Sequence, residues 1–67
     1  MDIGSALRRH REEAGLSQTK LSKATGITQQ NISRWEKNLV APTVEACIIL
    51  AKYYGITLEE LLNVRLP

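Results

Sequence analysis

Apolar residues recur along the chain at the spacing of amphipathic α-helices, and almost nothing in the pattern predicts a β-strand. Capping residues and glycines divide the pattern into five short helices, all within one domain that takes up residues 1–67. The fold is therefore expected to be all-α. The expected helices cover about Ile3–Ala14, Ser17–Thr25, Thr28–Asn38, Thr43–Tyr54 and the segment opened by the capping box Thr57–Glu60.

The same spacing assigns the buried side of each helix. In the second helix, Leu21 and Ala24 are expected to point inward. In the third, Ile32 and Trp35 form the apolar pair, so Trp35 is expected in the core rather than stacked on a base. The helix after Thr43 is apolar nearly all round, which is typical of a central helix that is covered on several sides.

Residues 17–38 have the pattern of a helix-turn-helix. Gly26 falls in the turn, where glycine alone adopts a positive φ without strain. Ile27 follows and can fill the angle between the two helices. A rigid corner of this kind lets the second helix project while the first braces it.

The outward face of that second helix carries hydrogen-bonding side chains and no carboxylate. Gln30, Ser33, Arg34 and Lys37 are spaced i, i+3, i+4 and i+7, and Gln29 flanks them. In the major groove of DNA, glutamine can make two hydrogen bonds to adenine and arginine two to guanine. The pattern favours double-stranded DNA as the partner, with an ordinary polar surface helix as the alternative. The expected base-reading residues are Gln29, Gln30, Ser33 and Arg34.

Contacts to the DNA backbone are expected around this face. The free N–H groups at the start of the helix after Ser17 form a natural anion site. Such contacts orient a protein and set its affinity without specifying sequence. The expected phosphate contacts are Ser17, Gln18, Thr28, Asn31, Lys37 and Asn38, with Arg8 or Arg9 as a further candidate.

Two charged residues fall on apolar stripes. Arg11 shares the inner face of the first helix, and Glu36 lies beside the Ile32–Trp35 face of the third. An unpaired buried charge is costly. We therefore expect an Arg11–Glu36 ion pair that clamps the first helix to the base of the third.

Composition and charge narrow the function classes. One cysteine and one histidine leave no disulfide and no cysteine–histidine metal site, and fit a reducing, cytoplasmic location. The longest apolar run, Ala46–Ala51, is too short to cross a bilayer, so no membrane association is expected. Residues 8–37 carry seven basic and three acidic side chains. A one-sided basic footprint suits a polyanion, although a solvated helix face has the same composition.

Enzyme chemistry is not expected, because the chain has no nucleophile–base pair, paired carboxylates or phosphate-cradling loop, and no cofactor or metal is expected either. His10 is expected at the surface and Cys47 in the core, with Tyr53 and Tyr54 covering the core.

The chain has more apolar side chains than five small helices are expected to bury. Leu39-Val40 lies in the loop before Pro42, and the C-terminal tail is rich in leucine. Exposed apolar patches usually mark an interface, and a homodimer is the simplest use of this one. The alternative is an antitoxin-like or other module that holds a protein partner through Leu39-Val40 or the C-terminal leucines. The dimer candidates are Leu58, Leu61, Leu62, Val64 and Leu66.

At this point the residues resemble the lambdoid phage repressor and Cro family over essentially the whole chain. The matching string is Arg11…Gly15-Leu-Ser-Gln18-Thr-Lys-Leu21…Gly26-Ile-Thr28-Gln-Gln-Asn-Ile32-Ser-Arg-Trp35-Glu36, followed by Pro42, Gly55 and Leu58…Leu61-Leu62.

The resemblance implies a compact five-helix lambda-repressor-like domain of a bacterial or phage regulator, most often a repressor, which binds a pseudo-palindromic operator as a two-fold dimer. It implies base contacts at Gln29, Gln30 and Arg34. It also implies that Gln18 contacts a phosphate and braces Gln29, and it includes an Arg–Glu pair at Arg11 and Glu36.

The sequence departs from the family after the third helix. Asn38 replaces the usual glycine there, which is expected to be harmless. The larger departure is that residues 39–41 lack the lysine or arginine that many relatives carry. The missing charge predicts either a modest affinity or another use for this loop. The chain is expected to be either a complete Cro-like protein or a domain excised from a longer repressor.

Overall fold

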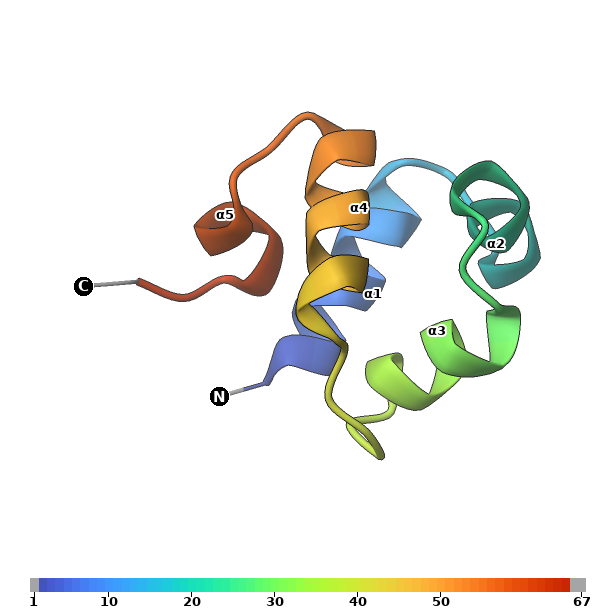
Figure 1. Ribbon diagram of the computed structural model, residues 1–67, viewed down its shortest axis with the longest axis horizontal. Helices are drawn as coiled ribbons and strands as arrows, with labels where there is room; N and C mark the ends of the chain where they lie inside the picture. Colours follow the sequence, from blue (N-terminus) through green and yellow to red (C-terminus); the bar gives the residue numbers. More distant parts are fainter. Residues whose placement is uncertain (1, 66–67) are drawn as a thin grey trace.

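The computed structural model describes residues 2–65, which form five α-helices and no strand (Figure 1). The predicted all-α class and the order of the helices are confirmed. The first helix ends one residue earlier than predicted, because Ala14 is its C-cap. None of the helices in this part of the chain is long and apolar enough to cross a membrane. The helices are α1 (Ile3–Glu13), α2 (Gln18–Thr25), α3 (Gln29–Glu36), α4 (Val44–Tyr54) and α5 (Leu58–Leu62).

Each helix begins where a side chain accepts a hydrogen bond from a backbone N–H of the first turn. These N–H groups have no partner within the helix, so a capping oxygen stabilises the helix start. Thr57 and Glu60 complete the predicted capping box through two bonds of 3.1 Å. The N-cap residues are Asp2, Ser17, Thr28, Thr43 and Thr57.

The helix ends are set by residues in the left-handed region. Gly26, between α2 and α3, has a φ of 79°, where a side chain would be strained. Asn38 follows α3 with a φ of 58°, which asparagine tolerates better than most residues. The predicted left-handed asparagine after the third helix is confirmed.

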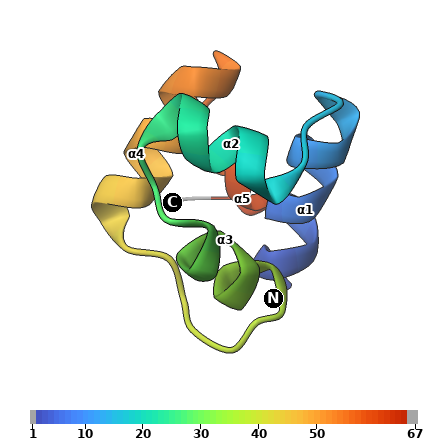
Figure 2. The same ribbon diagram turned by 90° about the vertical axis from the view of Figure 1, so that its right-hand side faces the viewer.

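The helices surround one shared core. In Figure 1, α4 stands in front of α1, with α5 on one side and α2 and α3 on the other. Figure 2, turned by a quarter, has α2 and α3 facing the viewer. The core therefore holds the α2–α3 corner from behind. Its buried members are Leu7, Leu21, Ile27, Ile32, Trp35, Ala46, Cys47, Leu50, Ala51 and Leu61.

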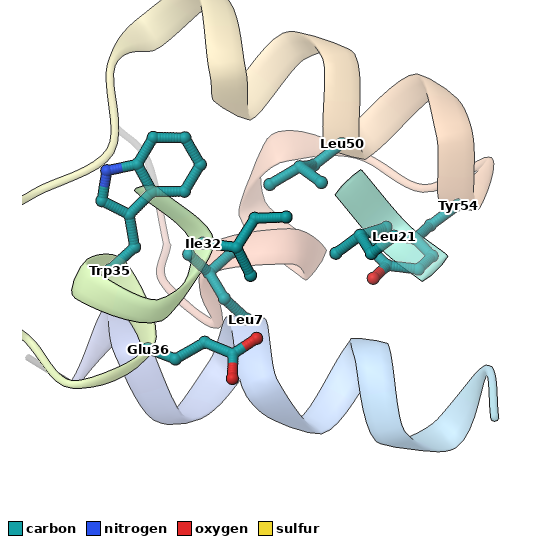
Figure 3. A pocket seen from close by; sticks show the side chains of 7 residues that line it. All are labelled: Leu7, Leu21, Ile32, Trp35, Glu36, Leu50 and Tyr54. Carbon is teal, nitrogen blue, oxygen red and sulfur yellow. The ribbon is translucent and has the colours of Figure 1, made fainter. Parts of the chain in front are cut away.

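A small cavity lies in the core between α1, α2, α3 and α4. Its volume is about 10 Å³, so it cannot take a ligand larger than a water molecule (Figure 3). Burial raises the pKa of the Tyr54 hydroxyl to about 12. That hydroxyl has no hydrogen-bond partner among residues 2–65. The lining residues are Leu7, Leu21, Ile32, Trp35, Glu36, Leu50 and Tyr54.

Three burial predictions are wrong. Tyr53 was expected to cover the core, but it is exposed, and only Tyr54 packs against the core. Ala24 is exposed, because α2 packs through Leu21 together with the half-buried Ser22 and Thr25, and Ala24 lies outside that arc. The helix α4 is covered on one side only. Four short helices are too few to surround α4, so its outward face remains exposed, with several apolar side chains among charged ones. The exposed apolar residues of α4 are Val44, Ile48, Ile49 and Tyr53.

His10 is not a simple surface residue as predicted. Its Nε2 lies 2.9 Å from the backbone oxygen of Glu60, and its ring centre lies 5.8 Å from that of Tyr54. His10 therefore fastens α1 to α5. Its partner is 50 residues away in the sequence, so local patterning contained no sign of this contact.

Candidate nucleic-acid interface

The corner between α2 and α3 is fixed on its inner side. Ile27 is buried between the two helices, together with Leu21, Ile32 and Trp35. The turn is closed by the N–H of Gly26, which donates to the oxygen of Ser22 at 2.8 Å. Because the inner side chains fill the angle, α3 is held at one orientation and its other face projects.

The projecting face of α3 is open to solvent. The side chains of Gln29, Gln30 and Arg34 are exposed, and Ser33 is half-buried. Only Ser33 is partly covered by the described chain, and α3 lies on the face of the molecule that Figure 2 turns toward the viewer. The geometry thus leaves this face available to a partner.

Arg11 and Glu36 form the ion pair that the sequence predicts, beneath the exposed face. Arg11 Nε donates to Glu36 Oε2 at 2.7 Å, and Nη2 donates to Oε1 at 2.9 Å. The two side chains are only 11% and 5% exposed. Arg11 Nη1 also donates to the backbone oxygen of Leu16 at 2.8 Å. The hydrogen bond to Glu36 raises the pKa of Arg11. The pair therefore connects three parts of the chain: α1, the loop that precedes α2, and α3.

The ion pair continues into a chain of side-chain amides that reaches the exposed face. Gln18 Nε2 donates to Glu36 Oε1 at 3.1 Å, and Gln29 Nε2 donates to Gln18 Oε1, also at 3.1 Å. The brace of Gln29 by Gln18, which the resemblance implies, is present. The bond between Gln18 and Glu36 was not predicted, although a carboxylate can accept more bonds than Arg11 supplies.

The caps of α2 and α3 leave donors for an anion. The oxygens of Ser17 and Thr28 accept from the backbone N–H groups of Lys20 and Asn31 at 3.1 and 3.3 Å. Each hydroxyl still has its own proton to donate. Asn31 and Lys37 are exposed. These predicted phosphate contacts therefore border the open face of α3.

Asn38 makes hydrogen bonds within the chain that were not predicted. Its Oδ1 accepts from the N–H of Gly4 at 2.9 Å, and its Nδ2 donates to Asp2 Oδ1 at 2.7 Å. A Cβ on Gly4 would lie 2.5 Å from the backbone oxygen of Trp35, so α1 begins in close contact with the end of α3. The Asn38 amide therefore holds the junction of α1 and α3, and its predicted contact with a phosphate stays a prediction.

Arg8 and Arg9 are directed to carboxylates of their own helix. Arg8 Nε lies 3.4 Å from Glu12 Oε2, and Arg9 Nη1 lies 3.9 Å from Glu13 Oε1. Exposed pairs of this kind contribute at most about 1 kcal/mol to stability. They do reduce the free positive charge on α1, so the basic residues of α2 and α3 are the better phosphate candidates.

The predicted dimer surface needs correction. The side chain of Leu61 is completely buried, since α5 packs it into the core, and it is not available to a second chain. Leu58, Leu62 and Val64 are half-buried, and Leu66 lies outside the described residues. By contrast, Leu39 is 70% exposed and Val44 is 73% exposed.

An apolar groove lies beside these exposed residues, between the start of α1, α4 and α5. We call it the α4–α5 groove, and it has no charged lining residue. A second hollow, lined in part by Trp35, Asn38 and Val40, continues it to the end of α3. The sequence pattern did not predict this groove, because its lining combines residues that lie far apart in the sequence. Its lining residues are Ile3, Ala41, Pro42, Val44, Cys47, Leu58 and Leu62.

A rigid two-helix corner with an exposed polar second helix defines the helix-turn-helix class. The chain matches the helix-turn-helix family over residues 7–61 and belongs to that family. It is 35% identical over 57 residues to the HTH-type transcriptional regulator PuuR of Escherichia coli (strain K12), a match that covers 85% of this chain and 31% of the relative. It is 27% identical over 63 residues to the HTH-type transcriptional activator BcrR of Enterococcus faecalis, covering 94% of this chain and 31% of the relative. The chain therefore spans about a third of the length of these relatives.

Proposed function

We propose that this chain binds double-stranded DNA in a sequence-specific way and regulates transcription, with α3 lying in the major groove. The observation that carries the proposal is the open polar face of α3, held from beneath by Arg11 and Glu36. An α-helix fits the major groove, where amide and guanidinium groups distinguish base pairs. The base-reading residues are Gln29, Gln30, Ser33 and Arg34.

Contacts to phosphates orient the helix in the groove. The N-terminus of α2 directs its free N–H groups toward an anion, and Ser17 caps that end. The surplus of positive charge in residues 8–37 supplies the attraction that does not depend on sequence. The contacting side chains are Ser17, Gln18, Thr28, Asn31 and Lys37.

Repression is the regulatory outcome that the described residues support best. A domain that occupies a promoter blocks polymerase by its presence alone, whereas activation needs a second surface that contacts the polymerase. One relative is named an activator, so the position of the operator relative to the promoter will decide the outcome for each gene.

A second copy of the chain fits the α4–α5 groove. The half-sites of a two-fold operator lie about 34–36 Å apart, while the Cα extents of this molecule are 33 × 25 × 21 Å. In a two-fold dimer each α3 then lies about 17 Å from the axis, which is roughly half the longest extent of the molecule. The contact surface must therefore lie well apart from α3, and the groove between the start of α1, α4 and α5 is such a surface. Exposed Val44 and Ile48 widen its apolar surface.

A protein-interaction module is the second candidate, and the exposed side chains of Leu39 and Val40 favour it. Such a module would use the apolar loop to hold a different protein, and α3 would have no ligand. The two candidates differ in the dependence of DNA binding on salt, because neutralising phosphates makes affinity fall steeply as salt rises.

The test is selection of bound duplexes from a randomised pool, followed by affinity measurements at several salt concentrations. We expect a pseudo-palindromic site with two half-sites about one helical turn apart, and a steep loss of affinity with salt. Recovery of unrelated sequences, together with a weak dependence on salt, would refute DNA reading by this chain.

A further inference from the structure

We propose that Glu36, which is buried and does not reach DNA, selects adenine over guanine at the base that Gln29 meets. Glu36 does so by fixing which end of the Gln29 amide is free to face the base. The inference rests on the proposed function, because it requires α3 to lie in the major groove. Glu36 is therefore a positioning residue for specificity as well as a member of the ion pair.

The carboxylate of Glu36 sets the orientation of the amides that follow it in the hydrogen-bonded chain. Both oxygens of Glu36 accept hydrogen bonds from the Arg11 guanidinium, and Oε1 also accepts from Gln18. A carboxylate held in this way can only accept, so Gln18 must present its NH₂ group to it. The opposite orientation of the Gln18 amide would bring two oxygens together at about 3 Å.

The same logic passes from Gln18 to Gln29. With its NH₂ group on Glu36, Gln18 presents Oε1 to α3, and this oxygen accepts from Gln29 Nε2 at 3.1 Å. The oxygen and nitrogen of an amide have nearly the same shape, so sterics alone would not distinguish the two orientations of Gln29. The acceptor on Gln18 distinguishes them, and it is set by Glu36.

The fixed orientation decides what Gln29 can offer a base. One N–H of its NH₂ group is used by Gln18, which leaves the second N–H and the whole of Oε1. One donor beside one acceptor complements adenine, whose major-groove edge has N7 as acceptor and N6–H₂ as donor. Guanine presents two acceptors, N7 and O6, so Gln29 Oε1 would face an oxygen there.

Burial protects the origin of this chain from water. The side chains of Glu36 and Arg11 are almost fully buried, and Gln18 is half-buried above them. Arg11 is fixed by a further bond to Leu16, so the guanidinium does not turn away from the carboxylate. Gln29, at the outer end of the hydrogen-bonded chain, is exposed to the solvent.

The test reverses the direction of the chain with Gln18→Lys. A lysine ammonium only donates, so it can satisfy Glu36 but must meet the oxygen of Gln29. Gln29 then turns over and offers two N–H groups, which complement guanine. The base pair to be scored is the one at which Gln29→Ala abolishes discrimination. We expect wild type to favour adenine there by roughly tenfold or more, and Gln18→Lys to lower the adenine-to-guanine affinity ratio by at least that factor.

Gln18→Glu is the matched control. It changes the charge at the same position, but it keeps an acceptor in front of Gln29, so Gln29 keeps its orientation. We expect weaker binding to every sequence, because the new carboxylate repels phosphate and Glu36, and an adenine preference that is retained. Neither variant removes the Arg11–Glu36 pair, and thermal melts verify that both proteins are folded.

The outcomes separate this inference from the proposed function. An adenine-to-guanine ratio at the scored base pair that is equal in wild type and Gln18→Lys overturns the inference, as does a wild-type preference for guanine there. In both cases discrimination at the base read by Arg34 persists, so DNA reading stands. If wild type discriminates at no position, the proposed function fails, and this inference fails with it.

Discussion

The α2–α3 corner and the α4–α5 side of this small protein present opposite kinds of surface. At the corner, the exposed groups are polar and charged, and the amides are held in a hydrogen-bonded chain that begins at a buried ion pair. On the α4–α5 side, several large apolar side chains are exposed, and no charged residue lines the groove. The hydrogen bonds of the corner are made within one molecule, whereas an exposed apolar groove of this kind usually marks a site of contact with another molecule.

The difference arises because the small core buries the apolar side of α3 completely but cannot bury all the apolar side chains of α4. Trp35 and Ile32 anchor α3 from within, so its outer face can be entirely polar. The apolar residues of α4 outnumber the places in the core, so half of the helix surface is left for another molecule. Breaking each region separately should therefore have separate consequences.

The largest expected effect is on stability, at the base of the corner. Glu36→Ala leaves the buried Arg11 guanidinium without a partner, which typically costs about 3–5 kcal/mol of the free energy of unfolding. In a domain of this size, such a loss lowers the melting temperature by more than about 10 °C. Thermal melts followed by circular dichroism measure it. Glu45→Ala, at an exposed glutamate in the first turn of α4, should lower the melting temperature far less, because it removes only a favourable charge at a helix start. A normal melt for Glu36→Ala would disprove the structural role of the pair.

The next effect is on DNA recognition by the outer face of the corner. Arg34→Ala should lower the affinity for the selected operator by about 1–3 kcal/mol and relax the preference at one base pair. Lys37→Ala should instead weaken binding to all sequences alike and reduce the salt dependence. Competition assays with cognate and scrambled duplexes separate the two. Equal losses on both duplexes for Arg34→Ala would mean that this residue does not read bases.

The third prediction concerns the α4–α5 groove. Val44→Glu places a charge on its rim, so dimer formation on the operator should weaken at least about tenfold, while the melting temperature of this exposed site barely changes. Ile49→Glu introduces the same charge on the other flank of α4 and should leave the dimer intact. Sedimentation of the protein with operator DNA measures both. A dimer that resists Val44→Glu would assign the contact to another surface.

The sequence predicts local features of this fold well and long-range ones poorly. Helix boundaries depend on residues within one turn, so the caps at Ser17, Thr28 and Thr57 could be located without a structure. Coverage of α4 depends on how many helices reach it, and periodicity carries no such information.

The same limit applies to the site. The Arg11–Glu36 pair was predictable because both charges fall on apolar stripes. The hydrogen bonds of Asn38 with Gly4 and Asp2 were not predictable, since these residues are 34 and 36 positions away in the sequence. The third hydrogen bond that Glu36 accepts, from Gln18, was not predictable either, because an exposed helix start gives no sign that its side chain turns inward.

The smallest expected effect is a dependence of stability on pH, which arises at the junction of α1 and α3. Hydrogen bonds from the Ser5 hydroxyl, the Ser5 N–H and the Asn38 amide lower the pKa of Asp2 to about 2 from an ordinary value of 3.8. Because the folded pKa is depressed, Asp2 stabilises the fold fully above about pH 4 and loses this contribution as the pH falls through 2. The melting temperatures of wild type and Asp2→Ala should therefore differ at neutral pH and converge toward pH 2. A constant difference would show that the Asp2 charge is not involved.

The most direct test of the central claim is to map, by NMR of the labelled chain, which backbone amides shift when the selected operator is added. The account predicts that the largest shifts fall on α3 and on the start of α2, around Gln18, Gln29 and Arg34. It also predicts smaller shifts along the α4–α5 groove, from contact with the second copy. Shifts confined to the groove and the Leu39-Val40 loop, with α3 unaffected, would contradict the claim that this corner reads DNA.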